Sequence, residues 1–361
     1  MLRVLFLPKY SPLGSSSRYR IYQYLPYLRQ QGFSCETHPL LSDNYVARIY
    51  EAQGLRGSSM RYLEYLTSFA RRTRALVVAR RYDLVFFEKE LFPYFPYLLE
   101  PCLRSANAHL VVDYDDAIFV SYERSHSRLI RWALGNKIAR VIASCKAAIV
   151  GNDYLRQYAS RYSRNVHLIP TAIDLKRHEP TAQRVEPRDK IVIGWIGTPV
   201  TAEYLKVVQE ALSVVARKYP VVLKVVGAPS FQMRSVPTEA TPWSFDTEVG
   251  EILGFDIGIM PVPDDEWAKG KCGLKLLQYM AVSLPSVATP IGANTEIIED
   301  GVNGFLANST EDWIEKLSWL IEDGSLRHRL GSNGRRTVEE RYSLEVNAPK
   351  LKRVLEQAAA C

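Results

Sequence analysis

The apolar residues in the first half of the chain form short continuous runs that alternate with longer amphipathic segments. Leu2–Leu7 is the first run, and Pro8 ends it. A continuous apolar run of this length is typical of a strand buried on both faces of a parallel sheet. The same pattern predicts strands at residues 83–87, 109–112, 147–150 and 166–169, and helices at 18–31, 44–81, 91–104, 125–146 and 153–162. This alternation predicts a Rossmann-like α/β half.

The alternation restarts in the second half, after a segment with two prolines and mixed charge at residues 178–189. The pattern there predicts strands at 191–196, 221–226, 255–261 and 286–290, and helices at 201–219, from about 273, from about 292, and at 311–322, 325–342 and 345–360. Prolines and mixed charge between two periodic regions are typical of a linker. We therefore predict an α/β protein with two domains, residues 1–177 and 190–344.

The most specific stretch of the chain is residues 267–299. A small, basic loop at residues 269–273 runs directly into LKLLQYMA, which is rich in good helix formers. A helix that starts near Gly273 leaves its first N–H groups without intrahelical partners, at the positive end of the helix dipole. Lys271 and Lys275 add full charges one helical turn apart. This combination suits a diphosphate, and the alternative is a surface helix with solvated lysines.

The order of motifs in this region resembles that of the retaining glycosyltransferases of family four, which have the GT-B fold. That family shows Phe-Gly-Leu, a helix that ends in Glu-Ala-Met-Ala, Gly-Leu-Pro-Val-Val-Ala-Thr, Gly-Gly-x-x-Glu-Ile-Val and Asp-Gly-x-x-Gly-Phe-Leu. The matching segments here are residues 272–274, 278–281, 283–289, 292–298 and 300–306. Residues 170–174 also resemble the family's Pro-Asn-Gly-Val-Asp, which closes the first domain. The resemblance covers most of residues 165–345, and residues 1–165 more loosely.

The resemblance implies two Rossmann-like domains that face each other across a cleft, and a last helix, residues 345–361, that crosses back to the first domain. It implies hexosyl transfer, with retention of configuration, from a nucleotide-sugar such as a UDP- or GDP-sugar to a glycan or a lipid-linked acceptor. No cofactor and no metal ion are expected. The donor-binding residues expected, besides Lys271 and Lys275, are Gly14, Thr198, Gly273, Leu274, Gln278, Asn294 and Glu296.

The chain departs from the family pattern around the donor. Two family glutamates eight positions apart align with Gly270 and Gln278. Gln278 can still bond a ribose hydroxyl, whereas the role of the first glutamate must have been lost or passed to Glu266 or the lysines. The family's arginine and lysine after the first strand of the second domain are also missing, so we expect Lys271 and Lys275 to replace them. A sugar-nucleotide epimerase or hydrolase, and a non-catalytic relative that binds nucleotide-sugar or glycan, remain as alternatives.

Carboxylates follow two predicted strands of the first domain, where doubly wound folds hold catalytic groups. Glu88 ends one strand, and Asp113, Asp115 and Asp116 end the next. Asp115 aligns best with a histidine that the family commonly has near this position. The expected catalytic residues are Asp115, Asp113 and Glu88, and the expected acceptor-binding residues are Ser15, Arg18 and Lys89. The alternative for the aspartates is loop solvation and helix capping; Asp-x-Asp is also the metal motif of the GT-A fold, which the second half of the chain does not resemble.

The formal charge of +7 is unevenly distributed, because residues 1–185 contain 27 Lys and Arg against 15 Asp and Glu. The basic half could face an anionic membrane surface or an anionic acceptor. No nucleic-acid-binding motif accompanies the charge, and no apolar run is long enough to span a membrane. The five cysteines show no pairing or metal spacing, and Met1 leads directly into a strand. We therefore expect a cytoplasmic protein without a signal peptide, held peripherally at the inner membrane face.

Overall fold

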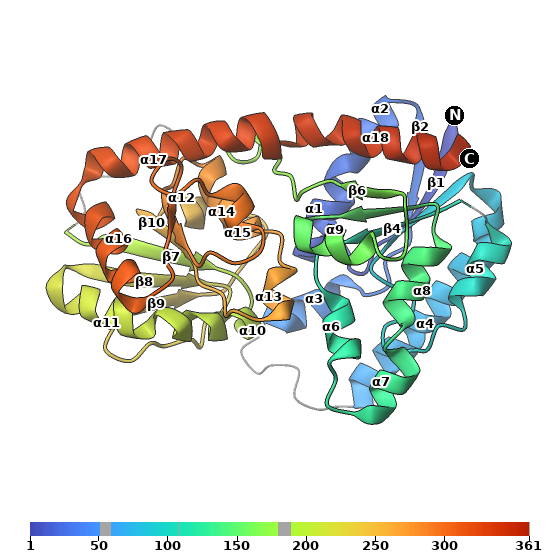
Figure 1. The fold of residues 1–361 in the computed structure, drawn as a ribbon, viewed down its shortest axis with the longest axis horizontal. Helices are drawn as coiled ribbons and strands as arrows, with labels where there is room; N and C mark the ends of the chain where they lie inside the picture. The colour runs from blue at the N-terminus through green and yellow to red at the C-terminus, as the bar shows by residue number, and fades with distance from the viewer. Residues whose placement is uncertain (51–58, 108, 180–188, 361) are drawn as a thin grey trace.

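The computed structural model describes residues 1–50, 59–107, 109–179 and 189–360, and its strands form two six-stranded sheets (Figure 1). The first sheet has the order β2-β1-β3-β4-β5-β6, and each strand pair in it is parallel. Its strands are β1 (Leu2–Leu7), β2 (Phe33–Thr37), β3 (Leu84–Glu88), β4 (Leu110–Tyr114), β5 (Ala147–Val150) and β6 (Val166–Leu168). The helices between them are α1 (Ser15–Arg20), α2 (Leu25–Gln30), α3 (Asp43–Tyr50), α4 (Ser59–Val78), α5 (Glu100–Ala106), α6 (Ile118–Glu123), α7 (Arg128–Leu134), α8 (Lys137–Ser144) and α9 (Asp153–Ala159).

The second sheet has the order β12-β11-β10-β7-β8-β9, and its pairs are also parallel. Its strands are β7 (Ile191–Ile196), β8 (Val221–Val226), β9 (Thr238–Thr241), β10 (Ile257–Met260), β11 (Ser286–Ala288) and β12 (Phe305–Leu306). Its helices are α10 (Pro199–Ala202), α11 (Gln209–Lys218), α12 (Glu248–Leu253), α13 (Glu266–Lys269), α14 (Leu274–Ala281), α15 (Asn294–Ile297), α16 (Thr310–Glu322) and α17 (Gly324–Thr337). The predicted α/β class with two Rossmann-like halves is confirmed.

The last helix, α18 (Leu344–Ala360), follows α17 and runs along the top of the first domain in Figure 1, where it ends beside the N-terminus. Leu351, Val354 and Leu355 are buried in a cluster with strand residues of the first sheet, among them Val4 and Phe86. Apolar residues at this helical spacing present one continuous face. The helix therefore belongs to the core of the first domain, as the resemblance implied.

Several helices are shorter than the apolar pattern predicted. The segment 18–31 is broken at Ile21, whose φ of −129° is not helical, and α1 starts at Ser15 instead of Arg18. The segment 125–146 is two helices, separated by Gly135 and Asn136. Residues 91–99 form turns, in which Tyr94 has a φ of +60°, so that only α5 is helical there. In each case turn-forming residues or a tertiary contact override helical periodicity.

Other differences concern short strands, a 3₁₀ turn and two segments outside the described residues. The pattern did not predict β2, β9 and β12, and the predicted helix 201–219 is interrupted by a 3₁₀ turn at Glu203–Val208. Short edge strands carry few apolar residues, which explains why periodicity alone missed them. Residues 51–58 within the predicted helix 44–81, and residues 180–188 within the predicted linker, lie outside the described residues.

The carboxyl ends of strands from both sheets meet at one place. Asp115 and Asp116 follow β4, Gly197 and Thr198 follow β7, and Met260 ends β10. All five line the same cavity between the two halves. Open α/β sheets bind ligands at the carboxyl ends of their strands, so this cavity is the candidate site.

Candidate functional site

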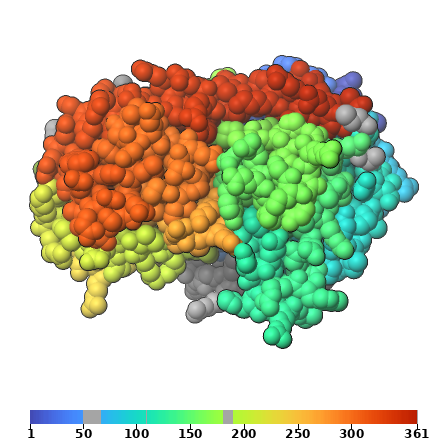
Figure 2. Space-filling model, viewed as in Figure 1, coloured from blue at the N-terminus to red at the C-terminus, as the bar shows by residue number. Residues whose placement is uncertain are grey.

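The cavity between the domains has a volume of about 200 Å³. In the space-filling view the domains touch beside it, where the orange segments of the second domain meet the green segments of the first (Figure 2). Asn152 donates two hydrogen bonds across this boundary, to the carbonyls of Lys269 and Lys271, at 2.9 and 3.0 Å. The cavity is lined by Ser15, Ser16, Tyr19, Arg20, Asp115, Asp116, Thr171, Ile196, Gly197, Thr198, Thr201, Trp243, Glu248, Met260, Lys271, Cys272, Gly273, Leu274, Lys275 and Gln278.

The predicted helix start at Gly273 is confirmed, since α14 begins at Leu274 with Gly273 as its N-cap. Gly273 has a φ of +69°, a left-handed conformation that glycine adopts most readily. A Cβ at this position would also lie 2.2 Å from the Cδ1 atom of Ile297. Gly273, Leu274 and Lys275 line the cavity, so the N-terminus of α14 lies beside it, as an anion-binding helix terminus requires.

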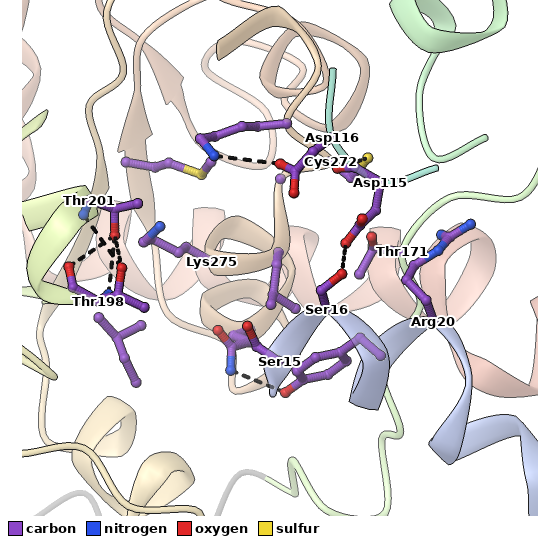
Figure 3. Close-up of a pocket in the computed structure, with 18 of the residues that line it drawn as sticks. Ser15, Ser16, Arg20, Asp115, Asp116, Thr171, Thr198, Thr201, Cys272 and Lys275 are labelled. Carbon is purple, nitrogen blue, oxygen red and sulfur yellow. Dashed lines mark hydrogen bonds and ion pairs between the residues drawn. The ribbon is translucent and has the colours of Figure 1, made fainter. Parts of the chain in front are cut away.

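The two lysines of this helix start both line the cavity. Lys275 lies with its Nζ atom 5.2 Å from the centre of the Trp195 ring, between Thr198 and Asp116 in Figure 3. Burial, together with the charge of Lys271, lowers the pKa of Lys275 to about 7. The Nζ atom of Lys271 is 3.6 Å from the Oδ1 atom of Asp116. An anion placed between the two lysines would favour the charged form of Lys275.

Asp113 does not line the cavity but is buried beneath it, in an ion pair with Arg20. The guanidinium donates to both carboxylate oxygens of Asp113, at 2.9 and 2.5 Å, and also to the carbonyl of Ile169. Burial raises the pKa of Asp113 to about 6 against the effect of Arg20, so the pair is ionised at neutral pH. This pair fixes the end of β4 on α1.

Lys89 is also buried, and both of its salt bridges reach the acidic loop after β4. Its Nζ atom lies 2.8 Å from Asp115 and 2.6 Å from Asp116. Burial opposes the charge of Lys89, but the two carboxylates outweigh it and raise its pKa well above the usual value. Burial likewise opposes the charge of Asp116, and Lys89 and Lys271 lower its pKa to about 2. Lys89 therefore holds the aspartates rather than standing free for a ligand.

Glu88 is fully buried and lies behind the cavity wall. The backbone N–H of Lys9 and the hydroxyls of Ser16 and Ser17 donate to its carboxylate. Ser16 also contacts Asp115 from the cavity side (Figure 3). Of the expected catalytic residues, only Asp115 reaches the cavity directly.

The remaining expected residues divide into two groups. Thr198, Leu274, Gln278 and Ser15 line the cavity, and Gln278 donates to the hydroxyl of Tyr19 at 3.1 Å. The other four residues, Gly14, Arg18, Asn294 and Glu296, are outside the lining. Gly14 packs on Tyr10, and Arg18 is paired with Glu248 at 3.1 Å. Asn294 donates to the carbonyl of Thr289, and Glu296 accepts from the backbone N–H of Asp153. The structure places these four outside the lining of this cavity, and their contact with a ligand stays a prediction.

The structure explains why residue 270, which aligns with the first family glutamate, is a glycine. A Cβ on Gly270 would lie 2.4 Å from the Cβ atom of Ala117 and 2.5 Å from its backbone nitrogen. The first domain therefore leaves no room for a side chain at residue 270. Glu266, the suggested substitute, bonds Arg124 at the surface, at 3.0 Å, and does not line the cavity.

Several lining residues escaped the sequence analysis. Ser16, Arg20 and Thr171 come from the first domain, and Thr201, Trp243 and Glu248 from the second. None of them stands in a motif that carries chemistry, and Trp243 and Glu248 reach the cavity only through the path of the chain around α12. A hydroxyl or a tryptophan of this kind gives no local signal, so only the tertiary structure could find them.

Comparison with known proteins gives one family and a set of similar folds. Residues 190–323 match the family model described as glycosyl transferases group 1. An uncharacterized glycosyltransferase of Methanocaldococcus jannaschii is 37% identical over 87 residues, and the chain spans only 24% of that relative's length. Sucrose-phosphate synthase of Thermosynechococcus elongatus has a TM-score of 0.72 at 15% identity, over 100% of both chains. HepE of Anabaena, solved with UDP and glucose, has a TM-score of 0.68 at 15% identity, over 99% of this chain and 100% of that chain.

Two parallel α/β domains that face one cavity, with a C-terminal helix that returns to the first domain, define the GT-B class of fold. Within this fold, residues 190–323 of the second domain match the glycosyl transferases group 1. The family expected from the motifs at residues 272–306 is thereby confirmed.

The buried Arg20–Asp113 pair yields a stability prediction. Arg20→Met should lower the free energy of unfolding by about 3–5 kcal/mol, because it leaves Asp113 buried without a partner. Urea unfolding measures this loss, and Arg20→Met/Asp113→Leu should recover a large part of it. The control is Arg3→Met, which breaks an Arg–Asp pair whose side chains are 54% and 36% exposed and should cost far less. Equal losses in the two single variants would contradict the prediction.

Proposed function

We propose that the protein transfers a hexosyl group from a nucleotide-sugar to a glycan or lipid-linked acceptor, with retention of configuration. The observation that carries the proposal is that positively charged groups of one domain and a carboxylate of the other line the same cavity. The second domain contributes a helix N-terminus with Lys271 and Lys275, and the first contributes Asp115. The lysines suit a diphosphate leaving group. The carboxylate of Asp115 lines the same cavity from the first domain.

The donor side is supported by the charge at the start of α14. Preorganised cations and helix N–H groups stabilise negative charge that develops on a leaving diphosphate. They would do so without a metal ion, and we propose a metal-independent reaction. HepE, whose fold is similar, was solved with UDP and glucose, which supports a uridine or a related nucleotide-sugar as the donor here.

The acceptor side is supported by the position of Asp115 between Lys89 and Ser16. The carboxylate lines the cavity from the first domain, where it could touch an acceptor hydroxyl or the reacting sugar. For a retaining transfer the leaving phosphate itself could also take the acceptor proton. The proposal therefore gives Asp115 a role in turnover rather than in donor affinity.

One observation favours a second candidate, a non-catalytic protein that binds nucleotide-sugar. Gly270 stands where the family has a glutamate, and its contact with Ala117 excludes any side chain. Binding of a UDP-sugar by calorimetry, without release of UDP against any acceptor, would favour this candidate over the transferase.

We further propose that the first domain holds the protein at the inner face of an anionic membrane. Among the described residues no helix is long and apolar enough to cross a bilayer, so any contact would be peripheral. The short helix α7, at the lower end of the first domain in Figure 1, exposes Leu129 by 71% and Trp132 by 84%. Arg128 and Arg131 beside them are exposed as well. Apolar and basic side chains on one surface suit an anionic lipid interface.

The first prediction from the proposed function concerns the binding of the diphosphate. Lys271→Ala or Lys275→Ala should weaken the binding of UDP by roughly tenfold or more, because a charge-assisted hydrogen bond is worth about 1.5–3 kcal/mol. Calorimetric titration measures the affinity. The control is Lys269→Ala, which removes an exposed lysine that pairs with Asp264 and does not line the cavity. Unchanged affinity in both test variants would contradict the proposed donor site.

The second prediction concerns pH. Lys275 has a pKa of about 7, and a bound diphosphate would favour its charged form and raise that pKa. Above the pKa of the free protein, binding of a UDP-sugar should therefore take up a fraction of a proton, and affinity should fall as pH rises. Calorimetry in two buffers of different ionisation enthalpy measures the uptake. It should disappear in Lys275→Met; equal heats for the wild type in both buffers would refute it.

The third prediction concerns the carboxylate. Asp115→Asn should lower turnover by about a hundredfold or more, as loss of a group that handles a proton does, while the affinity for the UDP-sugar changes little. Single-turnover kinetics separates the two effects. Asp264→Asn, an exposed surface change, is the control. Turnover within twofold of the wild type would make Asp115 a structural residue.

The fourth prediction concerns the membrane. The protein should sediment with anionic vesicles at low salt and lose this binding as salt is raised, since each basic residue at the surface contributes about 1 kcal/mol. Leu129→Ser/Trp132→Ser should weaken binding at low salt. The control is Val302→Ser, which changes an exposed apolar residue of the second domain. Protein that remains in the supernatant at low salt would refute the membrane proposal.

A further inference from the structure

The hydroxyl of Ser16 lies between two carboxyl groups. Its Oγ atom is 2.5 Å from the Oε1 atom of Glu88 and 2.5 Å from the Oδ2 atom of Asp115. Glu88 is fully buried, whereas Asp115 lines the cavity. Ser16 stands in the first turn of α1 and therefore links a buried acid to the candidate site.

Both contacts have the length of an O–H···O hydrogen bond, and each such bond needs one proton. A serine hydroxyl carries only one proton. If both carboxyls were ionised, one of the two oxygen pairs would be held at 2.5 Å with no proton between them, and two lone pairs would face each other. The geometry is satisfied when one carboxyl donates to Ser16 and Ser16 donates to the other.

The surroundings do not remove the need for that proton. Glu88 accepts on its second oxygen from the backbone N–H of Lys9 and from Ser17, so that among the described residues its Oε1 atom has only Ser16 as a hydrogen-bond partner. The second oxygen of Asp115 faces the ammonium group of Lys89 at 2.8 Å. The other ionisable groups around the pair are Lys9, Tyr22, Arg72, Asp113, Asp116 and Cys272. The positive charges among them stabilise one ionised carboxylate in the pair but supply no donor at the two oxygens that face Ser16.

We propose that Glu88, Ser16 and Asp115 share one carboxylic acid proton, and that Ser16 is the positioning residue that passes it between the two carboxyls. Reversal of the two hydrogen bonds moves the acid proton from Glu88 to Asp115 while the serine keeps one proton throughout. The carboxyl that faces the cavity can thus be ionised or protonated without a movement of the chain. Ser16 thereby joins the expected residues Glu88 and Asp115 in one unit.

The consequence for catalysis rests on the proposed transferase function. With the acid proton on Glu88, Asp115 is ionised and can accept the proton of an acceptor hydroxyl. The acceptor oxygen then bonds to the anomeric carbon, and the bond from that carbon to the diphosphate breaks, with its electron pair on the diphosphate. The unit now holds two acid protons, and it returns one to solvent after the products leave.

The test is infrared spectroscopy of the protein without substrate, at about pH 8, where Asp113 with its pKa of about 6 is ionised. The wild type should show the C=O stretch of a protonated carboxylic acid. The band should be lost in Glu88→Gln and in Asp115→Asn, because each change leaves a single carboxylate of the pair. It should also be lost in Ser16→Ala, because the two carboxylates are then no longer bridged and each keeps its own donors. Ser16→Thr, which keeps the hydroxyl, should retain the band.

The matched control is Glu100→Gln. Burial raises the pKa of Glu100, so this variant removes another buried acid and should leave the band of the shared proton in place. Absence of the band from the wild type, or its survival in Glu88→Gln or Asp115→Asn, would overturn the proposal. The spectrum needs no turnover, so it decides the proton site even if no acceptor is ever glycosylated. If transfer does occur, Ser16→Ala should lower kcat by roughly tenfold or more with little change in the KM for the UDP-sugar, and Ser16→Thr should restore most of it.

Discussion

Negative charge buried at the ends of β3 and β4 is the constraint on which the rest of the site depends. Glu88, Asp113 and Asp115 lie within this region, and a buried carboxylate is tolerated only with hydrogen bonds or an opposite charge. Helix α1 supplies much of the compensation, because Ser16 and Ser17 bond Glu88 and, one turn later, Arg20 bonds Asp113. The early start of α1 at Ser15, three residues before the apolar pattern begins, is therefore required by the acids that it covers.

The same charges connect the two domains. Lys271 approaches Asp116 at 3.6 Å, and the thiol of Cys272 donates to the carbonyl of Asp115 at 3.3 Å. Burial and the nearby aspartates raise the pKa of Cys272 well above its usual value, so this thiol is an uncharged packing group. The basic loop before α14 thus has two partners: the acidic loop of the first domain on one side, and the open cavity on the other.

Close packing between the domains also explains how this chain differs from the family pattern. The backbone of Ala117 fills the space that a side chain at residue 270 would need. A glutamate there would have to displace the start of α6, next to the aspartates that Lys89 holds. With that position closed and no basic residue directly after β7, the positive charge that the second domain brings to the cavity comes from Lys271 and Lys275. Burial and the charge of Lys271 lower the pKa of the half-buried Lys275 to about 7.

The sequence by itself determined the class of fold, the resemblance of the second domain to a glycosyltransferase family and the start of α14, because these depend on local signals: apolar runs, glycine at a left-handed position, and motifs in a fixed order. It also found Asp115, since a carboxylate after a buried strand lies at the ligand-binding edge of the sheet. Only the tertiary structure decided that Glu88 and Asp113 are buried behind the wall, that Lys89 and Arg18 are already paired, and that Asn294 and Glu296 face other partners. The reason is physical: residue type and spacing fix which groups reach a strand end, whereas burial and pairing there depend on side chains that other elements bring from far along the chain.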